Sequence, residues 1–355
     1  MHAHVHHTDP ERLTGLLSLD DVDHLLTSTA LRTPALRIAR DGTVLPSSDY
    51  TRSASLAGQP MPGLVDGRKA IALFEDGASL VLQGLQRYWP PLADLVAALE
   101  RALGHPCQAN AYLTPPQSQG FARHSDSHDV FVFQTHGRKR WEVHDSSGPR
   151  EVLMEPGVCM YLPTGTPHAA RALAEASLHV TLGINRLTWR QLLTRIAGEA
   201  LHDERFDAPL PAGYLDDPSR LAGPIAENLQ ELIAAFGAQQ PHALAAGQAS
   251  RFLTTRHRPL RGALRDRIRL PEITDTTVLV RHPGTPCVLA ATGDRLRVLL
   301  GDREVRMPQR LRAPMEFVRD HERLRPADLA AWLDPESRLV LTRRLVREGL
   351  LGLGE

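Results

Sequence analysis

The stretch that decides the fold runs from residue 110 to residue 141 and reads NAYLTPPQSQGFARHSDSHDVFVFQTHGRKRW. It interleaves short apolar runs with Gly, Pro, Ser and Asp, and this character extends over residues 107–184. Five runs have the composition of strands: Ala109–Leu113, Val130–Phe133, Arg140–Val143, Val158–Leu162 and Leu178–Leu182. Short strands separated by turn residues at regular intervals predict a small antiparallel barrel or sandwich.

His124 and Asp126 are the first candidate metal ligands of this stretch. Residues two apart in an extended chain project from the same face, so an imidazole and a carboxylate can reach one point. A third ligand, His168, follows the Pro/Gly turn in YLPTGTPH, residues 161–168. Two imidazoles and one carboxylate leave one side of a metal open for substrate and dioxygen, as in non-haem Fe(II) oxygenases, although zinc accepts the same ligands.

Lys139 distinguishes an iron oxygenase from a zinc hydrolase. It is one of two lysines in the chain and follows a predicted turn at Gly137. A buried ammonium near a metal is costly unless an anion meets it. 2-Oxoglutarate supplies that anion, because its keto-acid end chelates iron while its far carboxylate reaches the lysine. We therefore predict Fe(II) as the metal and 2-oxoglutarate as the co-substrate.

Each of these features alone has an ordinary structural interpretation. The chain has 17 histidines, so a chance HxD pair is expected, and a PxGTPH segment is commonly just a turn. We interpret His128, His136 and His144 as surface or supporting residues. The prediction depends on the joint occurrence of three ligands and a lysine, in order and at workable spacing.

The segments NAYLTPP, SQGF, HSD, HDVFVFQ, GRKRW, LPTGTPH and SLHVT together resemble the JmjC-type (cupin) 2-oxoglutarate/Fe(II) oxygenases of the ribosomal-oxygenase family. The resemblance is dense over residues 79–184. It implies an α+β fold with a double-stranded β-helix (jelly-roll, cupin) core. The expected domains are a JmjC domain at residues 1–187 with its core at 68–187, a helical dimerisation region at 188–262, and a winged-helix-like C-terminal domain at 263–355.

The resemblance also assigns roles to individual residues. It implies iron ligands at His124, Asp126 and His168 and a 2-oxoglutarate carboxylate contact at Lys139. It adds further co-substrate contacts at Tyr112 and Asn110, and pocket-lining residues at Thr181 and His179. Two positions depart from the family pattern: Ser125 replaces a common aromatic residue, and Gly183 replaces a small hydroxyl residue. Such changes alter the shape of the pocket or the choice of substrate.

Periodicity predicts the secondary structure of the remaining chain. We expect helix over residues 10–27, two strands in 68–85 around Asp76–Gly77, and a helix over 92–103 opened by Pro90–Pro91 and stopped by Gly104. Helices return near 188–200 and 224–236. The C-terminal part reads as strands at 277–280, 287–291 and 296–300 and helices at 314–322, 326–332 and 335–348. We interpret the histidines at positions 2, 4, 6 and 7 as part of a solvated, mobile terminus.

Composition limits the remaining classes of function. Basic and acidic residues balance at 41 each, which disfavours a strongly basic nucleic-acid binder. The three cysteines form no CxxC pair, so neither a disulfide framework nor a thiolate zinc site is indicated. No apolar run is long enough to span a membrane. We therefore expect a cytoplasmic protein. The family resemblance, not the composition, implies a protein or peptide substrate and a homodimer. The periodic apolar residues of 188–260 would form the dimer interface or pack onto the chain's own barrel.

The predicted reaction is hydroxylation of a side-chain carbon, with succinate and CO2 as co-products. The resemblance implies an arginine or histidine of a ribosomal protein as the target. One alternative is a tailoring hydroxylase of a ribosomally made natural-product peptide, which Ser125 and Gly183 would permit. N-methyl-lysine demethylation is a weaker alternative, because no aromatic cage is indicated. A different class is a non-catalytic cupin scaffold with a partner- or DNA-binding C-terminal domain, although acidic residues interleave with the arginines there.

Overall fold

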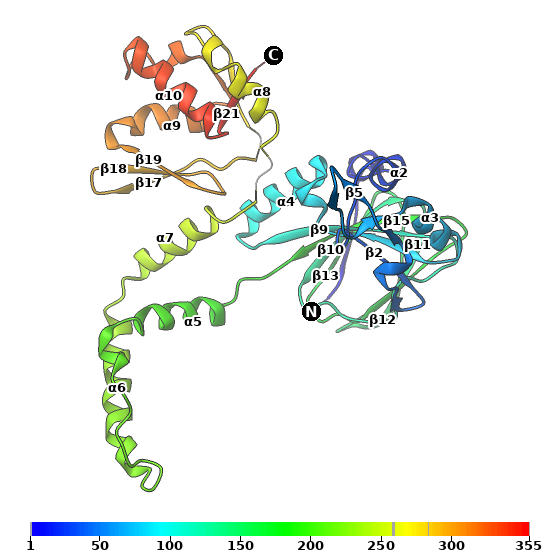
Figure 1. Ribbon diagram of the computed structural model, residues 1–355, viewed down its shortest axis with the longest axis horizontal. Coiled ribbons are helices and arrows are strands. Elements are labelled where there is room, and N and C mark those ends of the chain that lie inside the picture. The colour runs from blue at the N-terminus through cyan, green and yellow to red at the C-terminus, as the bar shows by residue number, and fades with distance from the viewer. Residues whose placement is uncertain (1, 258–259, 283, 355) are drawn as a thin grey trace. The chain divides into compact units, whose positions relative to one another are not determined.

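The computed structural model describes residues 2–257, 260–282 and 284–354 (Figure 1). It divides into two compact units. One combines the residues up to Arg186 with those from His257 onward, and the other consists of Leu187–Arg256.

Two antiparallel sheets form the first part of the chain, up to residue 186. The large sheet has the strand order β1 (His4–His7), β13 (Val158–Leu162), β10 (Asp129–His136), β15 (Ser177–Ile184), β9 (Cys107–Thr114), β8 (Ser79–Leu82), β2 (Leu36–Arg40) and β3 (Thr43–Val44). The small sheet has the order β12 (Gly148–Met154), β11 (Lys139–Asp145) and β14 (His168–Ala172). Apolar residues of both sheets join in one buried cluster, so the sheets pack face to face as in a cupin.

Strand alternation separates the two faces of the large sheet. On β15, Leu178, Val180 and Leu182 belong to the core on the helical side. The residues between them, His179, Thr181 and Gly183, therefore point between the sheets. The adjacent strand β9 pairs in register with β15 and alternates in the same way. On β15 and β9 the sequence pattern thus positions His179, Thr181 and Tyr112 inside the barrel and apolar side chains beneath the helices.

Helices cover the outer face of the large sheet. They are α1 (Pro10–Thr14), α2 (Leu19–Thr27), α3 (Gly67–Glu75) and α4 (Pro90–Leu103), and buried residues of α2, α3 and α4 pack into the same core as the sheet. α4 begins at Pro90 and ends at the left-handed Gly104, as the sequence predicts. The predicted helix over 10–27 is instead two helices, because Ser18 and Asp21 form a capping box that starts α2.

The first of the two strands predicted in residues 68–85 is not present in this described part of the chain. Residues 67–75 form helix α3 rather than a strand, because the Asp66 side chain accepts hydrogen bonds from the backbone N–H groups of Arg68 and Lys69. The predicted second strand is present as β8. Short elements connect this region: β4 (Thr51–Arg52), β5 (Ser55–Leu56), β6 (Gln59–Pro60), β7 (Leu64–Val65), η1 (Ser47–Asp49) and η2 (Leu85–Arg87).

The prediction of a mobile N-terminus is wrong. Residues His4–His7 form strand β1, which pairs with β13 from His4 opposite Tyr161 to His7 opposite Val158. Ala3 is buried, and its backbone N–H donates to the Asp145 carboxylate. His4, His6 and His7 thus belong to an edge strand that extends the large sheet, and His2 precedes it.

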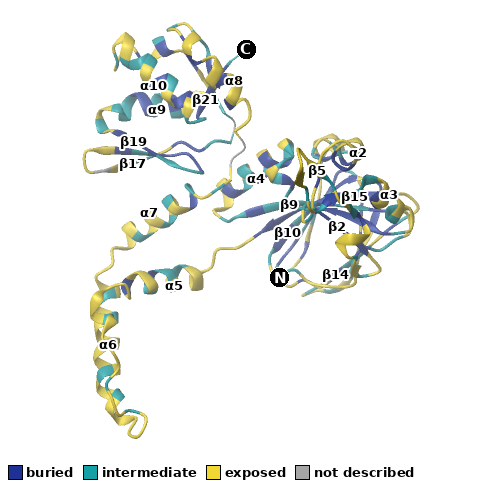
Figure 2. Cartoon of the chain, in the orientation of Figure 1, coloured by how far each residue is buried: buried dark blue, intermediate teal, exposed yellow. Residues whose placement is uncertain are grey.

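Unit Leu187–Arg256 is helical. It contains α5 (Trp189–Ala200), η3 (Glu204–Asp207), α6 (Ser219–Gly237) and α7 (Pro241–Phe252). Figure 2 shows that α6 is largely exposed, and several of its large apolar side chains face solvent in the isolated chain: Ile225, Leu229, Ile233 and Phe236. No helix that the structure describes has the length and apolar character needed to cross a bilayer.

The C-terminal part is a mixed α/β module with its own buried core. Its helices are α8 (Ala263–Ile268), η4 (Leu270–Glu272), η5 (Gln309–Leu311), α9 (Arg312–Asp320), η6 (Pro326–Leu329) and α10 (Pro335–Arg347). One three-stranded sheet has the order β20 (Arg323–Leu324), β16 (Leu279–Arg281) and β21 (Leu351–Leu353). The other has the order β17 (Val288–Thr292), β18 (Arg295–Leu299) and β19 (Glu304–Pro308). The three predicted strands and the helices near 314–322 and 335–348 are confirmed here, whereas the predicted helix over 326–332 is only a 3-10 turn at Pro326–Leu329. The elements α8, β19, β20 and β21 are additional.

Candidate functional site

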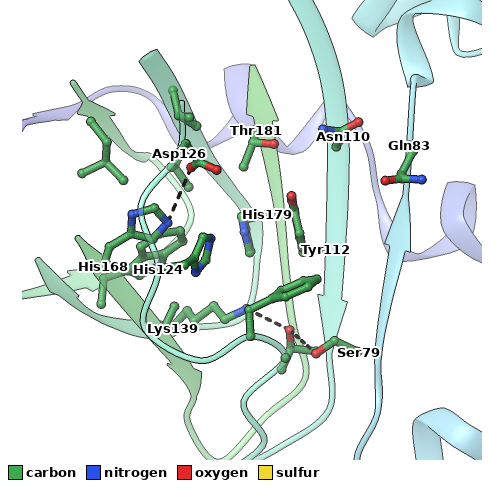
Figure 3. Close-up of a pocket in the computed structure, with 18 of the residues that line it drawn as sticks. Ser79, Gln83, Asn110, Tyr112, His124, Asp126, Lys139, His168, His179 and Thr181 are labelled. Carbon is green, nitrogen blue, oxygen red and sulfur yellow. Dashed lines mark hydrogen bonds and ion pairs between the residues drawn. The ribbon is translucent and has the colours of Figure 1, made fainter. Parts of the chain in front are cut away.

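The three predicted metal ligands converge at one point (Figure 3). One ligand atom from each of His124, Asp126 and His168 lies within 4.8 Å of the others, and among the described residues no other such group of His, Cys, Asp or Glu is found. The backbones of His124 and His168 exchange two hydrogen bonds, of 3.0 and 2.8 Å, and the Gly165 N–H donates to the Asp126 carbonyl at 2.9 Å. Backbone contacts therefore hold the two ligand-bearing loops together.

The hydrogen bonds of the imidazoles prepare them as ligands. Nδ1 of His124 lies 2.9 Å from the Ala122 carbonyl, and Nδ1 of His168 lies 3.0 Å from the Thr166 carbonyl. A carbonyl only accepts, so each Nδ1 is the donor and each Nε2 keeps a lone pair. Burial lowers the pKa of His168, which favours the neutral ring. Nε2 of His168 lies 3.7 Å from the Asp126 carboxylate, as expected of two ligands of one ion.

Lys139 is buried at the base of the same cavity. The Gly137 turn carries the chain from β10 in the large sheet to β11 in the small one, and a Cβ at Gly137 would lie 2.0 Å from the Ala176 carbonyl oxygen. The ammonium donates to Thr114 Oγ1 at 2.8 Å, and Ser79 donates to the same oxygen at 3.0 Å. Burial lowers the Lys139 pKa to about 7. An ammonium has three protons to donate, so this group can receive a carboxylate.

The residues implied by family resemblance line the cavity between the metal site and Lys139. Tyr112 stacks on His179 with ring centroids 4.9 Å apart. Burial, with the charges of Lys139 and His168, holds the His179 pKa well below its usual range, and burial raises the pKa of Tyr112. Thr181 faces the cavity, whereas the Asn110 side chain already accepts a hydrogen bond from the Gly84 N–H at 3.0 Å. All of the predicted site residues thus reach one cavity.

The cavity has a volume of about 240 Å³ and is lined by residues of both sheets. Three of the lining residues carry a buried polar atom without a hydrogen-bond partner: His179 Nδ1, Trp141 Nε1 and Arg37 Nε. Native proteins rarely leave such atoms unpaired, so a polar ligand or water fits here. Sequence reasoning missed several lining residues: Arg37, Ser79, Gln83, Gln108 and Thr114. Thr114 and Ser79 lie within residues 79–184, where the family resemblance is dense, but their hydrogen bonds with Lys139 and with each other are visible only in the fold.

Gly183 and His128 form a pair at the opposite end of the cavity from Lys139. A Cβ at Gly183 would lie 2.6 Å from His128 Nε2 and 3.3 Å from Gln108 Cγ. The imidazole therefore occupies the space that a side chain at position 183 would need. His128, interpreted from sequence as a surface or supporting residue, lines the cavity.

Asp129 fixes the turn that precedes His168. Its carboxylate accepts hydrogen bonds from the Thr164 N–H at 2.8 Å, the Thr164 hydroxyl at 2.6 Å and the Tyr161 hydroxyl at 3.0 Å. Burial opposes ionisation, but these hydrogen bonds and Arg186 at 3.6 Å lower the Asp129 pKa overall. The turn and its ligand are held in place by this carboxylate.

The donor set fits a divalent metal that keeps open positions. Two neutral imidazoles and one carboxylate are the ligands of the facial triad, and the remaining cavity carries no second carboxylate among the described lining residues. Lys139 lies beyond the triad as an anion receptor. The arrangement can bind a metal together with a small anionic co-substrate.

Comparisons with known proteins agree with this geometry. Residues 85–192 match the family model described as JmjC domain. The chain is 32% identical over 247 residues to "Ribosomal oxygenase 1" of Rattus norvegicus, covering 59% of this chain and 40% of that protein. It is 34% identical over 190 residues to "Bifunctional lysine-specific demethylase and histidyl-hydroxylase NO66" of Branchiostoma floridae, covering 48% and 31%. The chain thus spans less than half the length of these curated relatives.

The fold is also that of solved structures. The E. coli ribosomal oxygenase YcfD superposes with a TM-score of 0.55 at 19% identity, covering 99% of this chain and 94% of that one. The same protein in complex with cobalt and 2-oxoglutarate superposes with a TM-score of 0.53, also at 19% identity. At this identity the likeness establishes the shared fold.

Proposed function

We propose that this chain, whose residues 85–192 form a JmjC domain similar to that of ribosomal oxygenases, is an Fe(II)- and 2-oxoglutarate-dependent oxygenase that hydroxylates a side-chain carbon of a protein or peptide. One observation carries the proposal: the buried Lys139 ammonium, which donates one hydrogen bond to Thr114 and can donate others, lines the same cavity as the His-Asp-His cluster. A zinc hydrolase has no need of that lysine.

Five residues would hold the cofactors. His124, Asp126 and His168 would bind the metal, and Lys139 with Thr114 would receive the far carboxylate of 2-oxoglutarate. When bound, iron would supply the chemistry that converts C–H, 2-oxoglutarate and O2 into C–OH, succinate and CO2.

The protein's own residues position and shield this chemistry. The two backbone carbonyls at Ala122 and Thr166 keep the ligand rings oriented, and Asp129 holds the turn before His168. Buried Val130 and Val132 line the cavity and exclude water from the site. The Tyr112 phenol stays protonated and can donate a hydrogen bond into the cavity.

The decisive experiment is an anaerobic titration of the protein with Fe(II) and 2-oxoglutarate. The visible charge-transfer band of the iron-bound keto acid should form, disappear in His124→Ala, and require more 2-oxoglutarate in Lys139→Ala. Iron binding without this band would exclude 2-oxoglutarate as the co-substrate. Absence of iron binding would favour the scaffold alternative.

The substrate is proposed to be a protein side chain, by analogy with relatives named ribosomal oxygenase and histidyl-hydroxylase. Arginine or histidine of a ribosomal protein is the first choice. Hydroxylation of a natural-product peptide is the second, because Gly183 and His128 give this cavity a different rim from the family pattern. Incubation with ribosomal proteins, followed by mass spectrometry for a 16-Da increase, distinguishes the two.

We propose roles for the two regions that follow the JmjC domain in sequence. We place a helical dimerisation region at residues 188–262 and a winged-helix-like domain at 263–355, in a cytoplasmic homodimer that does not depend on nucleic acid. The exposed apolar side chains of α6 support the dimer. Sedimentation should give a dimer for the native chain and a monomer for Ile233→Glu, with 2-oxoglutarate binding unchanged.

A further inference from the structure

Arg37 lies on the wall of the same cavity. On β2, Leu36 and Ile38 are buried in the core on the helical side, so Arg37 between them faces the barrel interior. Strand pairing places Arg37 opposite Val81, and Val81 opposite Tyr112. A single row across the large sheet therefore connects Arg37 with the residues beside the metal site.

The guanidinium of Arg37 has no anionic partner among the residues that the structure describes. It lies over the Phe121 ring, 5.2 Å from the centroid, and its Nε is buried without a hydrogen bond. Arginines on the outer surface of the same region behave differently: Arg123 pairs with Glu142 at 2.6 Å and Arg138 with Glu175 at 3.1 Å. A half-buried cation that faces a cavity unpaired is a candidate ligand-binding group.

The charges in the cavity do not balance without a further anion, if the proposed function holds. Asp126 is the only carboxylate among the described lining residues, and the metal would use it. The two negative charges of 2-oxoglutarate, together with Asp126, offset the charge of Fe(II) and of Lys139. The positive charge of Arg37 remains in excess, and a half-buried cation without an anion is unfavourable.

We propose that Arg37 binds a carboxylate of the substrate. The substrate would be an acidic peptide segment, with Asp or Glu next to the hydroxylated residue. An arginine target is disfavoured, because its guanidinium would enter a cavity that already holds Arg37 and Lys139. A neutral target such as histidine is compatible. The inference rests on the proposed function and selects among its substrates.

Binding of labelled peptide pools tests this proposal without turnover. Three pools of equal length share a central histidine, with neighbours that are Asp/Glu, Asn/Gln or Lys/Arg. Fluorescence anisotropy is measured anaerobically on the protein loaded with Fe(II) and 2-oxoglutarate. The acidic pool should bind at least about tenfold more tightly than the amide pool, as expected of a charge-assisted hydrogen bond. Arg37→Gln should remove this difference, and Arg37→Glu should shift preference to the basic pool.

Controls separate this inference from the proposed function. Arg40→Gln, at the exposed end of the same strand, should bind all pools like the native protein. Equal binding of the three pools, preference for the basic pool, or no binding of any pool overturns the inference, provided that the iron–2-oxoglutarate band forms normally. If Arg37→Gln instead raises the 2-oxoglutarate concentration needed for the band, Arg37 serves the co-substrate and the inference is also wrong. Absence of the band in the native protein overturns the proposed function itself.

Discussion

The two ends of the cavity differ in how firmly the fold specifies them. At the lysine end, Lys139, Thr114 and Ser79 are buried and joined by hydrogen bonds. At the glycine end, His128 occupies the space over Gly183, and the structure assigns its imidazole no hydrogen bond among the described residues. The difference teaches that the fold fixes the proposed co-substrate end through buried hydrogen bonds, whereas the proposed substrate end depends on the fit of one imidazole over a glycine.

Loss of a metal ligand should have the largest effect. His124→Ala removes one of three protein ligands, so iron-dependent turnover should fall by more than about 100-fold, since even loss of a supporting partner typically costs 10- to 100-fold. Bound iron and succinate formation measure the effect. His136→Ala, an exposed histidine on β10, is the matched control and should retain both. If His124→Ala retains iron binding and turnover, His124 is not a metal ligand.

Lys139→Ala should have the next largest effect. It leaves the far carboxylate of 2-oxoglutarate without a charge-assisted partner, worth about 1.5–3 kcal/mol, or roughly a 10- to 150-fold weaker affinity. Calorimetry with Mn(II) in place of iron measures it. Lys69→Ala, at an exposed position on α3, is the control lysine. An unchanged affinity would move the carboxylate contact to another residue.

The effect of pH on the affinity for 2-oxoglutarate should be smaller than the effect of Lys139→Ala and larger than that of Gly183→Ala. The Lys139 pKa of about 7 means that the free site is protonated below pH 7 and becomes neutral above it. Because the dianion needs the ammonium, affinity should be nearly constant below pH 7 and weaken about tenfold per unit above it. Proton uptake at pH 8, detected by calorimetry in buffers of different ionisation enthalpy, is the test. The dependence should disappear in Lys139→Arg.

Gly183→Ala should have the smallest effect on the co-substrate. The new Cβ forces His128 to move, so peptide KM should change by several-fold while 2-oxoglutarate affinity stays within about twofold. The double variant with His128→Ala should behave like His128→Ala alone. Gly198→Ala, where a Cβ meets nothing within 4 Å, is the control. If Gly183→Ala weakens 2-oxoglutarate binding as much as Lys139→Ala does, the distinction between the two ends is wrong.

The sequence predicted the lysine end far better than the rim. The three ligands, Lys139 and the Gly137 turn follow from residue types at fixed local spacings, and the structure brings them together. Arg37 was missed because it is one of many arginines, and its position in the cavity depends on the pairing of β2 with β8. Helix α3 was misread because its apolar cluster resembled a strand, although the Asp66 cap starts a helix.

The pairing of β1 with β13 links segments far apart in the chain. His4–His7 lies at an edge of the large sheet, opposite Val158–Tyr161. During synthesis, β1 has no partner until β13 has been made, so closing this pair means ordering a long loop. We therefore expect β1 to dock late in folding, after the metal-binding loops have met, and an intermediate lacking it would expose the edge of β13 to other chains.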